Sequence, residues 1–132
     1  HAHCDHVGGF EKLVTATQTG RTFAPAEEPH AGARSLQPDS KMQLCGFDIH
    51  AVKTSGHTKG ALSYIVYGLD LPVALVGDAL FSLSMGGAKS AYQLALKNNR
   101  EQLLSLPSET ILCPGHGPMT SVFEECAHNP FF

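Results

Sequence analysis

The chain begins with four potential metal ligands within six residues. Residues 1–6 read H-A-H-C-D-H, so that His1, His3, Asp5 and His6 offer three imidazoles and one carboxylate. In extended backbone, side chains two residues apart point to the same side, which allows His1 and His3 to bind one ion together. If the chain then turns into a helix, Asp5 and His6 face a neighbouring point. This one short segment could therefore serve two ions.

Three further candidate ligands share one local setting. His57 in S-G-H-T-K-G, Asp78 in V-G-D-A and His116 in P-G-H-G-P each follow an expected strand and have a glycine neighbour. Glycine permits positive φ and close backbone approach, which a tight turn at a strand end needs. If these strand ends lie on one edge of a sheet, their side chains converge. Five histidines and two aspartates suffice for two ions, and such donors suit zinc.

Each of these patterns also has a plainer explanation. A leading histidine cluster can be the remnant of an expression tag, but tags lack the interposed aspartate and the following glycine pair. Asp78 alone is what a turn or a helix cap requires. We expect His30, His50 and His128 to be surface or hydrogen-bonded histidines, and Cys4 to be a small buried residue rather than a soft ligand.

The surrounding pattern indicates short strands interleaved with helices, which is typical of an α/β or α+β layered domain. In the first part of the chain we expect a helix near 7–20 and then a proline-rich loop with at most one brief strand over 21–40. The middle part should contain a half-buried strand over 47–54 and a hairpin of 61–67 and 72–76. The last part should contain a helix over 90–106, a short strand over 110–113 and one helical turn within 121–132.

Composition places the chain among globular proteins of one domain. Of its 132 residues, 42% are hydrophobic and only 16% are charged, which excludes a disordered polyelectrolyte. A net charge of -3 argues against binding to nucleic acid, because contacts with phosphates need a basic surface. No window reaches the roughly 18 to 20 apolar residues of a membrane span. The four cysteines form no C-x-x-C pair, so we expect reduced thiols and a cytoplasmic location.

The order and spacing of these motifs identify a family. Together with the G-D-A-L-F that contains Asp78, they resemble the metallo-β-lactamase-fold hydrolases, most closely the glyoxalase II (hydroxyacylglutathione hydrolase)-like branch. The resemblance runs from His1 to the closing N-P-F-F. It implies an α/β fold, the αββα sandwich. Because the family domain has strands before its H-x-H motif, we expect residues 1–132 to form a single partial domain without those N-terminal strands.

The resemblance also implies a ligand set. One ion would be bound by His1, His3 and His57, and a second ion by Asp5, His6 and His116. Asp78 would bridge the two ions.

Such a site would hydrolyse a carbonyl compound. Two zinc ions about 3.5 to 4 Å apart share a water and lower its pKa toward neutrality, which produces a hydroxide that attacks the carbonyl carbon. Asp5 would act with this hydroxide by orienting it. The resemblance implies a thioester or related small-molecule acyl substrate. Lys59 and Lys89 could contact an anionic group of that substrate, although solvated lysines are the common alternative.

Other activities use nearly the same ligands. Lactone or β-lactam hydrolysis and RNA processing occur in the same superfamily, and the negative net charge argues against RNA. Sulfur dioxygenases that resemble this branch hold one iron with two histidines and an aspartate, and oxidise a glutathione persulfide. A non-catalytic domain that keeps the ligands is a third class. Metal analysis and oxygen consumption would separate these alternatives.

Overall fold

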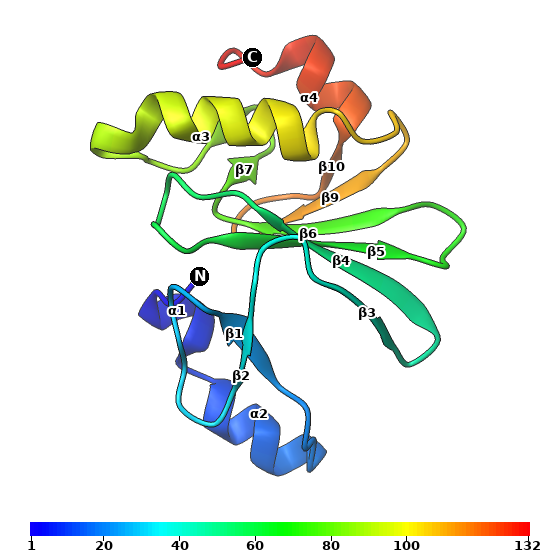
Figure 1. Cartoon of the computed structure of the whole chain (residues 1–132). Helices are drawn as coiled ribbons and strands as arrows, with labels where there is room; N and C mark the ends of the chain where they lie inside the picture. Colours follow the sequence, from blue (N-terminus) through cyan, green and yellow to red (C-terminus); the bar gives the residue numbers. More distant parts are fainter.

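A six-stranded sheet, in the order β10-β9-β6-β5-β4-β3, forms the centre of the computed structural model, which describes residues 1–132 (Figure 1). The strands are β3 (Lys41–Leu44), β4 (Phe47–Lys53), β5 (Leu62–Tyr67), β6 (Val73–Gly77), β9 (Ile111–Pro114) and β10 (Thr120–Ser121). Buried and more exposed residues alternate along β6, as expected of a strand with two unlike faces.

The directions of the strands decide where the candidate ligands lie. Strands β3, β4, β5 and β6 are consecutive antiparallel neighbours, and β6 pairs with β9 in parallel. Strands β4, β6 and β9 therefore run in one direction and end at the same edge of the sheet. A parallel pair needs a crossover. Here the crossover contains β7 (Leu80–Phe81), β8 (Ser84–Met85), the 3₁₀ turn η1 (Lys89–Ala91), α3 (Tyr92–Asn98) and its π-helical continuation η2 (Asn99–Leu103).

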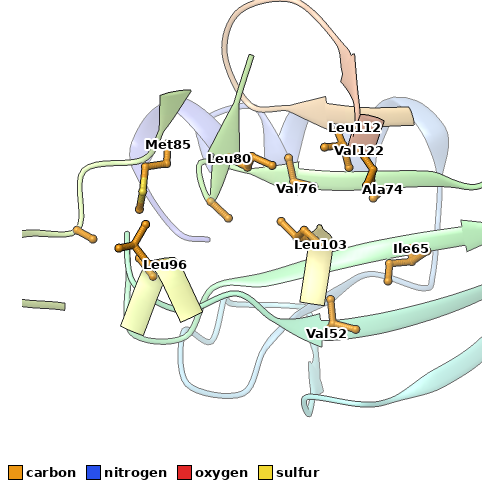
Figure 2. Packing of buried hydrophobic residues seen from close by; sticks show 13 residues of the cluster. Val52, Ile65, Ala74, Val76, Leu80, Met85, Leu96, Leu103, Leu112 and Val122 are labelled. Atoms are coloured by element: carbon orange, nitrogen blue, oxygen red, sulfur yellow. The ribbon is translucent and has the colours of Figure 1, made fainter. Parts of the chain in front are cut away.

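The main core lies between the sheet and the helices α3 and α4 (Val122–His128), which cover the same face in Figure 1. Thirteen buried apolar residues form this cluster. Figure 2 shows Leu103 of the crossover between Val76 and Val52 of the sheet, and Leu96 opposite Met85. Removing such apolar surface from water is the main favourable contribution to folding, and it fixes the sheet against the helices.

The N-terminal segment lies on the opposite side of the sheet (Figure 1). It comprises α1 (Cys4–Val7), α2 (Phe10–Thr17) and the parallel pair of β1 (Phe23–Pro25) and β2 (Arg34–Leu36). A small cluster of Leu36, Ala51 and Leu62 joins it to the sheet. This covering is incomplete, because Leu75 of β6 remains 47% exposed.

Most expected elements are confirmed. The strand over 47–54 is β4, the hairpin is β5 with β6, the helix over 90–106 is the η1-α3-η2 run, and the strand over 110–113 is β9. These segments have strong local signals, namely alternation, helical spacing and a proline that ends the helix.

Other expectations were wrong in detail. The helix expected near 7–20 is α2, which is shorter and has Gly9 as its N-cap. A separate one-turn helix, α1, precedes it and ends at Gly8, whose N–H donates to the Cys4 carbonyl. The region 21–40 contains two short strands rather than one. The tail forms a seven-residue helix whose first turn is capped by the Ser121 hydroxyl. Strands β3, β7, β8 and β10 were not predicted. None of the helices combines the length and apolar character that crossing a membrane requires.

Candidate metal centre

The H-x-H-x-D-H segment adopts the two conformations that its spacing predicts. His3 is extended, with φ -66° and ψ 148°, and the one-turn helix α1 follows directly. The centroids of the His1 and His3 rings lie 4.5 Å apart, and those of His1 and His6 lie 4.1 Å apart. The segment thus places His1 between a histidine from the extended part and a histidine from the helix.

His57 reaches the same place from the end of β4. Its loop packs tightly on α3: Gly56 has φ +150°, and a Cβ there would collide with the backbone of Ala95. The Nδ1–H of His57 donates to the Gly87 carbonyl at 3.0 Å. Because a carbonyl only accepts, this bond leaves Nε2 of the neutral ring with its lone pair. That Nε2 lies 3.2 Å from His3 Nδ1.

Asp78, at the end of β6, lies at the centre of the cluster and is buried. Its Oδ1 is 3.3 Å from His6 Nε2, while its Oδ2 is 3.5 Å from His57 Nε2 and 3.8 Å from His1 Nε2. The position requires small neighbours. A Cβ at Gly115 would collide with Asp78 Oδ1.

His116 follows β9 and lies on the exposed side of the cluster. Its Nε2 lies 3.1 Å from Asp5 Oδ2 and 3.7 Å from Asp78 Oδ2. The side chains of His116 and Asp5 are 56% and 52% exposed, whereas that of His1 is 2% exposed. The centre is therefore accessible from the end formed by Asp5 and His116.

The structure brings together all seven residues that the sequence singles out as ligands. Their donor atoms form three overlapping groups, each within 4.8 Å: His1, His3 and His57; His1, His6 and Asp78; and Asp5, His6 and His116. The first and third groups are the two sets that the family resemblance implies. The division of the residues between two ions stays a prediction.

The donor set fits divalent metal ions. His1 Nε2, His6 Nε2 and Asp78 Oδ1 are buried without a hydrogen-bond partner. Leaving a buried polar atom unpaired costs about 1 to 3 kcal/mol, so three such atoms facing one point indicate a ligand that completes them. Imidazole and carboxylate donors are those that zinc and iron accept.

Asp5 is the most accessible acid of the centre. A hydrogen bond from its own backbone N–H lowers the pKa of the Asp5 carboxyl below its usual value, and the nearby His6 and His116 act in the same direction. Asp5 therefore remains ionised at neutral pH.

Lys59 and Lys89 both line a cleft of about 750 Å³ that adjoins the cluster at His3 and His57. A third lysine of this cleft, Lys53, is bound by Glu27 at 2.8 Å. No acidic group lies within ion-pairing distance of Lys59 or Lys89, so both can meet an anionic ligand.

The remaining histidines lie elsewhere, as expected. His50 faces Asp39 at 3.9 Å and His128 faces Glu124 at 3.8 Å, while the ring of His30 packs on Phe10. The expectation for Cys4 was wrong. Its side chain is exposed, because it begins a one-turn helix that buries none of its residues.

Sequence reasoning did not identify the Gly87 carbonyl that orients His57. A backbone acceptor has no characteristic side chain, so the only sequence feature at this position is the glycine pair 86–87.

Comparison with known proteins identifies a family for this chain. The family model of the metallo-beta-lactamase superfamily matches residues 1–116. A hydroxyacylglutathione hydrolase of Erwinia tasmaniensis is 32% identical over 117 residues, which are 88% of this chain and 45% of the relative. This chain thus spans less than half the length of that enzyme.

Two solved structures share the fold over the whole chain. The BLEG-1 B3 metallo-beta-lactamase is 28% identical with a TM-score of 0.79, over 99% of this chain and 73% of the relative. TTHA1623, solved in a di-iron-bound form, is 31% identical with a TM-score of 0.72, over 100% of this chain and 74% of the relative. Because the family model matches residues 1–116, this chain belongs to the metallo-β-lactamase superfamily.

Proposed function

We propose that this chain carries the centre of a dinuclear zinc hydrolase that acts on thioesters or related acyl compounds. The position of Asp78 carries the proposal. Its two carboxylate oxygens reach different neighbours, with Oδ1 beside His6 and Oδ2 beside His57. One carboxylate is thus within reach of both predicted ligand groups, as a bridging ligand must be.

Two divalent ions bound in this centre would supply Lewis acidity toward a carbonyl oxygen and lower the pKa of a shared water. The residues of the chain hold and orient the reactants. His57 presents Nε2 because Gly87 holds its other nitrogen. Asp5, ionised and accessible, would accept a hydrogen bond from the attacking water and so orient it.

The adjoining cleft supports a small-molecule substrate. Its volume of about 750 Å³ falls within the roughly 300 to 1,000 Å³ of ligand sites. Lys59 and Lys89 would bind an anionic group of the substrate while the reacting carbonyl lies at the metal centre. The 32% sequence identity with a hydroxyacylglutathione hydrolase supports a thioester as the compound whose carbonyl reacts. The alternative substrate is a lactone or a β-lactam, and the similarity to the BLEG-1 B3 metallo-beta-lactamase supports the β-lactam.

A second candidate is an iron-dependent oxidation of a persulfide. The group of His1, His6 and Asp78 offers two imidazoles and one carboxylate, a donor set that is typical of non-haem iron. The relative in a di-iron-bound form supports iron as a possible metal of this fold. All four cysteines are free, which supports a reducing compartment such as the cytoplasm for either activity.

A substrate panel tests the proposal. The chain is loaded with Zn²⁺ or with Fe²⁺, and each form is assayed with an S-acyl glutathione, an aliphatic lactone, a β-lactam and glutathione persulfide. We expect the zinc form to hydrolyse the S-acyl glutathione fastest, and EDTA dialysis to abolish this turnover. Oxygen uptake with persulfide by the iron form alone would replace the first candidate by the second. Absence of turnover in every assay would contradict both.

A further inference from the structure

Glu28 links the two parts of the chain that carry the first group of candidate ligands. Its Oε2 accepts the backbone N–H of Ala2 at 2.9 Å, and Ala2 lies between His1 and His3. Its Oε1 accepts the backbone N–H of Gly60 at 2.7 Å. Gly60 ends the loop that carries His57. One carboxylate thus joins segments that are remote in sequence.

The surroundings of Glu28 are shaped for this contact. Gly60 is buried, and a Cβ there would lie 2.9 Å from Glu28 Cγ and 2.8 Å from Glu27 Cβ, so only glycine allows the approach. A turn in which the Glu28 N–H bonds to the Pro25 carbonyl at 3.0 Å fixes the backbone at the end of β1.

The charge of Glu28 strengthens both bonds. Burial alone would raise the pKa of its carboxyl, but the pKa is lowered, and the N–H groups of Ala2 and Gly60 that donate to the carboxylate contribute to this. Hydrogen bonds to an ionised acceptor are roughly twice as strong as those between neutral groups.

We propose that Glu28 is a positioning residue that sets the distance between the His1–His3 segment and the His57 loop. It touches none of the three imidazoles and acts through the backbone on either side of them. The close approach of His3 Nδ1 to His57 Nε2, at 3.2 Å, depends on this distance. An ion shared by these histidines needs all three donors held together, and outer groups that orient ligands typically contribute a factor of about 10 to 100 in metal affinity.

The test compares Glu28→Gln with Glu27→Gln. The neighbouring Glu27 loses the same charge but bonds only to Lys53, and so is a matched control. In Glu28→Gln, the amide NH₂ replaces one acceptor oxygen and faces a backbone N–H. We expect its affinity for the first Co²⁺ ion to fall about 10- to 100-fold, with a changed visible absorption spectrum of the bound Co²⁺. Glu27→Gln should bind Co²⁺ as the unaltered chain does.

Equal Co²⁺ affinity and equal spectra for the two variants would overturn the inference. If Glu28→Gln does not fold, amide hydrogen exchange of Gly60 is measured in the unaltered chain instead. We expect slow exchange that slows further when Zn²⁺ is added. Exchange at the rate of an unprotected amide would contradict the proposal. The inference rests on the proposed metal centre. Failure of the unaltered chain to bind Co²⁺ would contradict that centre, whereas equal binding by the variants would contradict only the role of Glu28.

Discussion

The His57 ring is oriented by the Gly87 carbonyl, which accepts a hydrogen bond from its Nδ1–H at 3.0 Å. This single bond selects the tautomer whose free Nε2 faces the cluster. It also couples the end of β4 to the crossover that follows Asp78, because Gly87 belongs to that crossover. The orientation of one candidate ligand therefore depends on the fold of the segment that carries another.

Replacing the central carboxylate should disable the metal centre. In Asp78→Asn the amide keeps the shape but has one acceptor oxygen and no charge, so it cannot serve both ligand groups. We expect the chain to retain at most one tightly bound Zn²⁺ and hydrolysis to fall more than about 100-fold. Asp39→Asn, which alters an aspartate that faces only His50, is the matched control. Full zinc content in Asp78→Asn would contradict the bridging role.

The lysines of the cleft should affect substrate binding more than turnover. In Lys89→Gln a side chain that lines the cleft keeps its polarity and loses its charge. We expect KM for an anionic acyl substrate to rise about 3- to 10-fold while kcat changes little, since binding that is equal in ground and transition states alters only KM. KM for a neutral ester of the same acyl group should not change. An equal effect on both substrates would remove Lys89 from the substrate site.

Glu125 should be important for stability. This buried carboxylate accepts hydrogen bonds from the Leu83 N–H, the Thr120 hydroxyl and the Asn129 amide, and so ties α4 to the β7-β8 turn. In Glu125→Gln an NH₂ group faces these donors, and we expect a loss of about 2 to 3 kcal/mol in the free energy of unfolding. Urea denaturation measures it.

The neighbouring Glu124 provides the control for Glu125, because its side chain is 55% exposed and pairs only with His128. Glu124→Gln should change the free energy of unfolding by no more than about 0.5 kcal/mol. Similar losses in both variants would show that the buried hydrogen bonds contribute nothing specific.

Tyr64 should make the chain less stable at alkaline pH. Burial raises the pKa of the Tyr64 phenol above 10.0. The folded state therefore holds this proton more tightly than the unfolded state, so the stabilisation is complete below about pH 10 and is lost as the pH rises through the folded pKa. In Tyr64→Phe the free energy of unfolding should fall less steeply above pH 10. Tyr67→Phe, at an exposed tyrosine of the same strand, should follow the unaltered chain, and coincident curves for all three proteins would contradict the assignment.

The candidate ligands could be identified from the sequence more readily than the contacts that position them. His57, Asp78 and His116 were identifiable because each follows a strand with a strong local pattern and has glycine beside it. Their convergence then required only that β4, β6 and β9 end at one edge, which follows from the antiparallel order of β4, β5 and β6 together with the parallel pairing of β6 and β9.

The supporting contacts could not be predicted in this way, because they depend on residues that are distant in sequence. Glu27 and Glu28 are adjacent and identical, yet one bonds to Lys53 and the other to Ala2 and Gly60. The parallel pairing of β1 with β2 escaped prediction for another reason: both strands have three residues, too few for a periodic pattern. Cys4 was misjudged because its neighbours are candidate ligands, whereas the one-turn helix that it begins buries none of its residues.

Counting zinc ions tests the central claim most directly. The chain is stripped with EDTA, titrated with Zn²⁺ in a calorimeter, and analysed for bound metal after gel filtration. We expect two ions per chain. The midpoint of thermal unfolding should rise as zinc binds the folded state, with about 2.7 kcal/mol of stabilisation when free zinc reaches 100 times the dissociation constant. A chain that binds no zinc, or only one ion in a site that Asp78→Asn leaves intact, would contradict a dinuclear centre bridged by Asp78.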